Sequence, residues 1–205
     1  MQNLSAVFFD FDGVLCTDRF YATLEPEYPN VTEWINRHVF GGESYFVRWM
    51  RGEFTHRQIN AIIAEKTGLE FDKLNELFIR SVRQMKINAA VIEFAKALQQ
   101  KNVKTALVTG NMDIFNEITV PEKQLDKIFP VIVNSYDYKL LKIDDNGRLF
   151  DIALKKLGLA SYEGVSLIDD SFTHCQIFHE KGGEFFHYTN VIEFEQWTKQ
   201  FLGSK

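Results

Sequence analysis

Two aspartates, Asp10 and Asp12, follow an apolar run near the N-terminus. Residues 7–9 of that run are typical of a fully buried strand in a parallel sheet, where a charge is costly unless it is paired or binds a metal. If strand geometry continues past the run, residues at i and i+2 face the same side, and the two carboxylates converge on one small volume. Gly13 then lets the chain turn sharply and brings its backbone close to whatever the acids bind.

Two converging carboxylates repel each other unless a cation lies between them, and magnesium is a hard cation that prefers oxygen ligands. Such a pair suits phosphoryl transfer: one aspartate attacks phosphorus to form an aspartyl phosphate, while the other donates a proton to the leaving oxygen and later activates water. An isolated pair also fits a strand end whose acids cap the next loop. Partners further along the chain decide between the two interpretations.

Two later segments supply such partners, Val-Thr-Gly-Asn at 108–111 and Leu-Ile-Asp-Asp-Ser at 167–171. Together with 7–15, they resemble the motifs of the haloacid dehalogenase-like hydrolase superfamily, most of whose members are magnesium-dependent phosphatases. The resemblance runs from 6 to about 188, with the motifs in the family's order. It implies an α/β fold: a doubly wound, Rossmann-like parallel sheet with a small all-helical cap inserted after the first strand.

The resemblance also implies roles for the first two motifs. Asp10 would be the nucleophile and would bind magnesium through its side chain. Asp12 would be the general acid and base, and would bind the metal through its backbone carbonyl. Thr109 would hold the phosphoryl oxygens of the substrate with its hydroxyl, helped by the neighbouring N–H groups of Gly110 and Asn111. Standing alone, the Thr109 hydroxyl would equally fit a local turn.

Asp169 and Asp170 would complete the magnesium site. Because they are adjacent, both cannot point the same way on a regular strand. One would bind the metal directly, while the other acts through water or holds a neighbouring group, and the sequence leaves open which does so. Asp170 or Ser171 also fits the N-cap of the following helix, which is compatible with the other acid being a ligand.

An active-site lysine is the fourth element that the resemblance implies, since it would stabilise charge on the nucleophile and the transferring phosphoryl group. Here the chain departs from the family's pattern, because no proline follows either Lys139 or Lys142, and the loop is two residues longer. The seven-residue interval from Ser135 that is common in the family favours Lys142. The turn-forming residues at 145–147 are expected to precede a helix.

Composition fits one sizeable core plus a small accessory unit, with 205 residues, 45% of them hydrophobic and 14% aromatic. A formal charge of −5 gives no field that would gather nucleic acid or an anionic membrane. An anionic substrate must then be drawn in by local cations. With no leader or membrane span recognised, we expect a cytoplasmic protein, either a monomer or a homodimer.

Strand-like and helix-like segments alternate after residue 87, which is typical of a parallel sheet covered by helices. The predicted strands are 103–108, 131–133, 165–169 and 185–188, and the predicted helices are 88–101, 113–119, 149–157, 172–181 and 191–202. Between 17 and 86 the pattern predicts only helices, including 32–40, 44–50 and one that begins with a capping box at Thr55. We therefore predict a core of 1–16 and 87–205, and a cap of 17–86.

Several cationic and aromatic side chains of the cap suit a phosphorylated sugar or nucleotide: Arg37, His38, Arg48, Trp49 and Arg51. On amphipathic helices such side chains are more often solvated or packed, so none is assigned to catalysis. His174 and His179, on the predicted helix 172–181, are expected to be structural for the same reason.

The leading hypothesis is a magnesium-dependent phosphatase that acts on a small phosphomonoester. A metal-free 2-haloacid dehalogenase has a similar fold, but displacement at carbon needs neither Asp12 nor the acids at 169–170. A phosphosugar mutase would use the same core residues, so the motifs do not separate it from a phosphatase. A non-catalytic protein that binds phosphate or a partner is favoured only by the unusual lysine loop.

Overall fold

The computed structural model describes residues 4–41 and 45–202. Within these ranges, five parallel strands form one sheet in the order β3-β2-β1-β4-β5. Their bounds are β1 (Ala6–Phe9), β2 (Lys104–Thr109), β3 (Val131–Asn134), β4 (Val165–Asp169) and β5 (Glu184–His187). The predicted doubly wound parallel sheet is confirmed. The strand order changes direction at β1, and ligands of such sheets bind beyond the carboxyl ends of the strands near that point.

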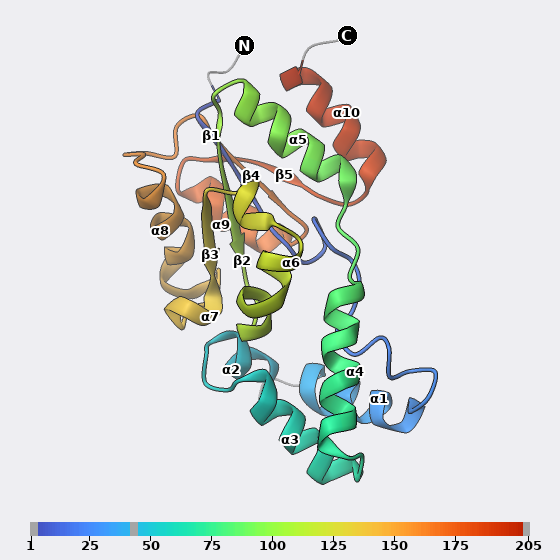
Figure 1. The fold of residues 1–205 in the computed structure, drawn as a ribbon. Coiled ribbons are helices and arrows are strands. Elements are labelled where there is room, and N and C mark those ends of the chain that lie inside the picture. The colour runs from blue at the N-terminus through green and yellow to red at the C-terminus, as the bar shows by residue number, and fades with distance from the viewer. Residues whose placement is uncertain (1–3, 42–44, 203–205) are drawn as a thin grey trace.

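Helices cover both faces of the sheet (Figure 1). Val7 and Phe9 pack with α5 (Ala89–Gln100) and α10 (Val191–Leu202), whereas Ala6 and Phe8 pack with α8 (Arg148–Lys156) and α9 (Phe172–Glu180). This alternation follows from the two-residue period of a strand that is buried on both faces. β1 is therefore held from both sides, which fixes the position of the loop that follows it.

The chain between β1 and α5 forms a helical segment that lies beyond one end of the sheet (Figure 1). Its helices are α1 (Pro29–Ile35), a π-helical continuation η1 (Asn36–Phe40), α2 (Phe46–Met50), α3 (His56–Thr67) and α4 (Phe71–Gln84). Between 17 and 86, the residues that the structure describes include no strand, as the sequence predicts. The division of the chain into a core and a cap at 16/17 and 86/87 stays a prediction.

Local signals account for several helix ends. Thr55 and Gln58 form the predicted capping box, with the Thr55 N–H donating to Gln58 Oε1 at 2.8 Å. The helix predicted over 32–40 begins earlier, at Pro29, because proline is favoured in the first turn. The helix predicted over 44–50 begins at Phe46, and Ser44 lies outside the described residues.

Short helices lie in the connections from β2 to β3 and from β3 to α8. They are η2 (Phe115–Thr119), α6 (Val120–Glu122), η3 (Leu125–Lys127), α7 (Ser135–Tyr138) and η4 (Asp144–Asn146). In the parts of the chain that the structure covers, no helix is both long and apolar enough to cross a membrane.

Candidate active site

The first acidic pair lies just beyond β1, because the strand ends at Phe9. The chain turns at once: the N–H groups of Leu15 and Cys16 both donate to Phe11 O at 2.9 Å. Strand geometry therefore does not continue past the apolar run, although the sequence prediction that Asp10 and Asp12 face the same side depended on it. The turn, and not strand alternation, brings Asp12 to the cavity that Asp10 also lines.

Gly13 makes this turn possible. Its φ of +76° is in the left-handed region, and an added Cβ would lie 2.0 Å from Asp170 Oδ2. The backbone after the first acidic pair thus passes directly beside the last acid of the site. The sequence predicted the turn, whereas the close approach to Asp170 is a finding of the structure.

Asp10 and Asp169 lie side by side at the ends of neighbouring strands. The register of β1 and β4 pairs Phe9 with Ile168, so the next residue of each strand is an aspartate. Lys142 reaches both acids, with its Nζ 2.5 Å from Asp10 Oδ2 and 2.7 Å from Asp169 Oδ2. All three side chains are almost completely buried.

Of the two candidate lysines, only Lys142 reaches the acids. Lys139 is exposed and follows α7 with a left-handed φ of 57°. The lysine loop, as we name residues 139–147, ends with Asp145, Asn146 and Gly147, which all have positive φ, before α8 begins. The turn predicted before this helix is confirmed, and it accommodates the loop without a proline.

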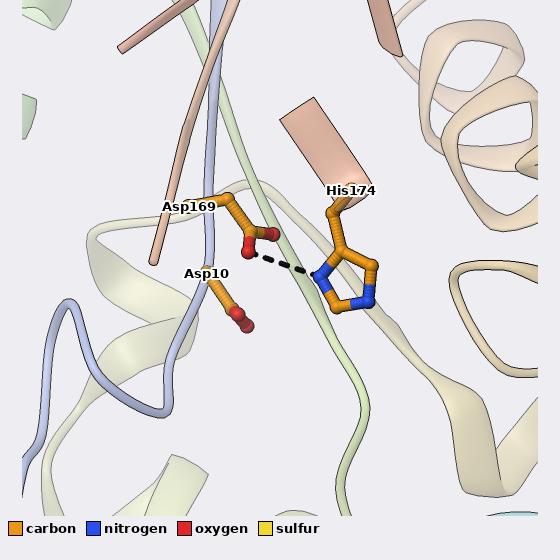
Figure 2. A group of neighbouring side chains, drawn as sticks. All are labelled: Asp10, Asp169 and His174. Carbon is orange, nitrogen blue, oxygen red and sulfur yellow. Dashed lines mark hydrogen bonds and ion pairs between the residues drawn. The ribbon is translucent and has the colours of Figure 1, made fainter. Parts of the chain in front are cut away.

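His174 joins this group from the first turn of α9, which Ser171 caps (Figure 2). Its Nδ1 lies 3.0 Å from Asp169 Oδ1, which also accepts the Ser171 N–H at 2.9 Å. The sequence analysis named this histidine but expected it to be structural, and did not connect it with Asp169. The signal was its position three residues after an N-cap that itself follows the acidic pair, which turns the side chain back toward the strand end.

The adjacent acids Asp169 and Asp170 diverge, as the sequence predicts. Asp169 is fully buried and Asp170 is exposed, with its carboxylate against Gly13. Asp12 has a different partner, since Asn111 Nδ2 donates to Asp12 Oδ2 at 3.3 Å. The N–H group of Asn111, which was expected to face the substrate, donates to Ser135 Oγ at 3.0 Å and to Asn134 Oδ1 at 3.2 Å.

Thr109 ends β2 and is completely buried. Its Oγ1 has no hydrogen-bond partner within residues 4–41 and 45–202. A buried polar atom in this state costs about 1–3 kcal/mol, so such an atom is usually explained by a ligand or water. The local-turn alternative for this hydroxyl finds no supporting hydrogen bond. Gly110, the next residue, lines the cavity that holds the acids.

The catalytic cavity, as we name the space between these groups, has a volume of about 250 Å³. Its walls are Asp10, Asp12, Phe46, Met50, Gly110, Leu141, Lys142, Ile143, Asp170 and His174. Phe46 and Met50 belong to α2, so the helical segment closes one side. Ser135 Oγ fixes this contact by donating to Met50 O at 2.8 Å.

Burial and charge act together on the ionisable groups. Burial raises the pKa of Asp10 well above its usual value, with Lys142 opposing and Asp169 adding to the rise. Burial likewise raises the pKa of Asp12 to about 6. The pKa of Asp169 is about 2, because Lys142 and His174 outweigh its burial. Burial alone would lower the pKa of Lys142, but the carboxylates of Asp10 and Asp169 raise it.

The donor set of the catalytic cavity fits a magnesium ion. Four carboxylates gather around one buried lysine, so the acids exceed the nearby cation. Oxygen donors of this kind are those that magnesium prefers, and a divalent cation would offset the excess negative charge. Ligand atoms of Asp10, Asp169 and His174 lie within 4.8 Å of one another (Figure 2).

The three arginines of the helical segment that the sequence analysis considered for substrate binding each pair with an acidic side chain. Arg37 pairs with Glu33 and Arg48 with Glu53, both on the surface. Arg51 instead binds the lysine loop: its two terminal nitrogens each lie 2.9 Å from an oxygen of Asp144. Asp144 Oδ2 also accepts the N–H of Leu141, the residue before Lys142.

Comparisons with known proteins identify the family of the chain and similar folds. A family model described as haloacid dehalogenase-like hydrolase matches residues 4–179. No curated protein sequence matches the chain significantly.

Several solved structures have a similar fold. A HAD family enzyme from Bacteroides thetaiotaomicron, in complex with magnesium and inorganic phosphate, is 16% identical with a TM-score of 0.71, over 91% of this chain and 94% of that one. A predicted HAD-like family hydrolase from Porphyromonas gingivalis is 14% identical with a TM-score of 0.73, over 99% and 100%. L-2-haloacid dehalogenase from Xanthobacter autotrophicus, with chloropropionic acid covalently bound, is 13% identical with a TM-score of 0.65, over 98% and 84%. At these identities the likeness concerns the fold alone.

Proposed function

This chain belongs to the haloacid dehalogenase-like hydrolase family, and from that premise we propose that it is a magnesium-dependent phosphatase. Its substrate would be a small phosphomonoester, such as a sugar phosphate or a nucleotide, hydrolysed through an aspartyl phosphate on Asp10. The observation that carries this proposal is the position of Lys142 between Asp10 and Asp169, inside a small cavity that Asp12 also lines. The magnesium and phosphate bound by the Bacteroides enzyme support it by analogy.

In the first step, an oxygen of Asp10 attacks phosphorus, and the bond from phosphorus to the leaving oxygen breaks. Asp12 donates its proton to that leaving oxygen. A pKa of about 6 for Asp12 keeps part of the population protonated near neutral pH, as a general acid requires. In the second step, the ionised Asp12 takes a proton from water, which attacks phosphorus and releases phosphate and free Asp10.

Other groups of the site would stabilise the charge that develops. Lys142 neutralises negative charge on Asp10 and on the phosphoryl group, and the unpartnered hydroxyl of Thr109 is available to a phosphoryl oxygen. Asp10, Asp169, Asp170 and the backbone carbonyl of Asp12 would hold magnesium. When bound, magnesium supplies a positive charge that offsets the repulsion between the nucleophile and the phosphate.

The test is phosphate release from p-nitrophenyl phosphate near neutral pH, with magnesium and with a chelator. We expect turnover that requires magnesium and that Asp10→Asn abolishes, since the amide removes the nucleophile with little change in volume. The thermal unfolding of the variant checks that it is folded. Equal turnover in Asp10→Asn would refute the covalent mechanism.

The product released separates the dehalogenase alternative from the phosphatase proposal, because a dehalogenase releases chloride. Chloride release from 2-chloropropionate, measured without metal, should be absent, because the acids beyond Asp10 have no part in displacement at carbon. Chloride release at a rate above that of p-nitrophenyl phosphate hydrolysis would reverse the assignment.

A further inference from the structure

A second cavity of about 520 Å³ adjoins the catalytic cavity. It is lined by Asp12, Asp18, Arg19, Phe20, Asn36, Phe40 and Phe46. Asp12 and Phe46 line both cavities. We call this larger space the outer cavity. Its volume lies within the range of about 300–1,000 Å³ that is usual for small-molecule sites.

The chemistry proposed above predicts which part of the substrate would occupy the outer cavity. The inference rests on that proposed function, in which Asp12 donates a proton to the leaving oxygen. The leaving group must therefore extend from Asp12 and away from Asp10 and Lys142, which hold the phosphoryl end. The outer cavity begins at Asp12 and does not include either of those residues.

Aromatic rings form one wall of the outer cavity. The rings of Phe20 and Phe40 are stacked, with centroids 6.5 Å apart and an interplanar angle of 19°. The Phe40 and Phe46 rings meet edge to face at 5.5 Å. All three side chains are only partly buried, so ring surface remains for a ligand. Flat rings pack well against such a wall, in stacked or edge-to-face arrangements.

The outer cavity also offers one cation. Arg19 is exposed, and apart from its electrostatic effect on Asp12, its guanidinium has no hydrogen bond or ion pair with any residue in the described ranges. The neighbouring acid, Asp18, accepts the Lys86 N–H at 2.7 Å and so has a partner of its own. A guanidinium that lacks a carboxylate partner can bind one from a ligand through two parallel hydrogen bonds.

We propose that the outer cavity binds the leaving group and selects phosphomonoesters whose leaving group is a planar ring bearing a second anionic group. The ring packs against Phe20, Phe40 and Phe46, and the anion binds Arg19. The preferred substrates thus differ from plain sugar phosphates in two features, a planar ring and a second anionic group.

The charge is tested with a matched pair of substrates, 3-carboxyphenyl phosphate and phenyl phosphate. We expect the native protein to have a kcat/KM at least tenfold higher for the carboxylated ester, and Arg19→Gln to lose that preference. Arg83→Gln is the control, because Arg83 is exposed, pairs with Glu122 and lines neither cavity. A ratio near one in the native protein, or an unchanged ratio in Arg19→Gln, overturns the role of Arg19.

The ring is tested by comparing phenyl phosphate with glycerol 2-phosphate. Phe40→Leu keeps an apolar side chain but removes the flat ring, so the preference for phenyl phosphate should fall several-fold. An unchanged preference in a folded Phe40→Leu variant overturns the aromatic part of the proposal.

A binding measurement keeps the inference separate from the proposed function. Binding of 3-hydroxybenzoate and of phenol, followed by NMR titration, needs no turnover. We expect 3-hydroxybenzoate to bind at least fivefold more tightly to the native protein, and this difference to disappear in Arg19→Gln. If no ester is hydrolysed, the phosphatase proposal fails while this difference still supports the outer cavity as an anion-selective site. Equal binding of the two ligands overturns the inference even if both esters are hydrolysed.

Discussion

The ammonium group of Lys142 lies between two buried carboxylates, so replacing it leaves negative charge uncompensated where the substrate's own charge must enter. We expect Lys142→Met to lower kcat with p-nitrophenyl phosphate by about 100-fold or more, the scale of losing one electrostatic stabiliser. Lys139→Met is the matched control, because Lys139 is exposed on the same loop. Comparable losses in the two variants would argue against a role for Lys142.

His174 holds Asp169 from the side opposite Lys142. Groups that orient a metal ligand typically affect metal affinity or activity by about 10–100-fold. His174→Ala should therefore raise the magnesium concentration needed for half-maximal activity by about tenfold. His179→Ala provides the control, since His179 is on the same helix but contacts Gly183 O. An unchanged magnesium requirement in His174→Ala would limit that residue to a structural role.

At this scale, the sequence predicts that three polar residues gather, because each lies at the end of a buried strand. Asp10, Thr109 and Asp169 all lie at carboxyl ends of neighbouring strands, as parallel-sheet geometry requires. His174 could not be found in that way, because its contact depends on how α9 is rotated relative to β4. The choice between Lys142 and Lys139 depended on the path of an irregular loop.

The lysine loop connects the candidate site to the helical segment. Arg51 at the end of α2 binds both oxygens of Asp144, and Asp144 in turn holds the Leu141 N–H. The position of Lys142 thus depends on a contact between α2 and the loop. Small displacements of a catalytic group are enough to reduce turnover strongly.

Asp144→Asn tests this connection. Losing the charge of Asp144 weakens its contact with Arg51, so we expect kcat to fall about tenfold with little change in KM, as for a misplaced catalytic group. Asp145→Asn is the control, because Asp145 lies on the same loop, pairs with exposed Arg148, and has a left-handed backbone that asparagine tolerates. A rise in KM without a change in kcat would mean that Asp144 acts on binding instead.

Periodicity predicts most elements, with ends that differ by a few residues. β4 was predicted with its observed bounds, and β5 begins one residue earlier than predicted, at Glu184. The strand predicted at 7–9 is observed as β1 over Ala6–Phe9, and it ends before Phe11 although that residue is apolar and buried as well. Hydrophobic pattern cannot distinguish a buried turn from a buried strand, and here the turn hydrogen bonds decide.

At the scale of the whole molecule, Asp113, which follows β2, binds two residues of the helical segment through hydrogen bonds. Its Oδ1 accepts Trp49 Nε1–H at 2.8 Å, and its Oδ2 accepts the His56 N–H and contacts His56 Nδ1, both at 2.8 Å. Burial would raise the pKa of Asp113, but the hydrogen bonds from His56 and Trp49 lower it overall. Asp113 also follows Thr109 closely in sequence, so it links the segment after β2 to the helical segment.

A lowered pKa in the folded state means that Asp113 stabilises the protein above its unfolded pKa of about 4, and that this contribution is lost as pH falls through the folded value. We expect Asp113→Asn to reduce the free energy of unfolding by about 2 kcal/mol at pH 7, the scale of a buried charged hydrogen bond. Urea unfolding at pH 7, 5 and 3 measures the difference, which should shrink below pH 4. A difference that stays constant over this range would contradict this role of the ionised Asp113.

The cytoplasmic location and the monomer or homodimer state stay predictions.

β1 lies in the middle of the sheet, but both of its neighbouring strands come much later in the chain. Its partners β2 and β4 begin at Lys104 and Val165, after the whole helical segment. During synthesis, an apolar strand with two phenylalanines therefore waits without a partner while the helices between 29 and 84 can already fold. Such non-local pairing is slow and leaves strand edges open to aggregation. The ion pair between Asp10 and Lys142 therefore cannot form until most of the chain has been made.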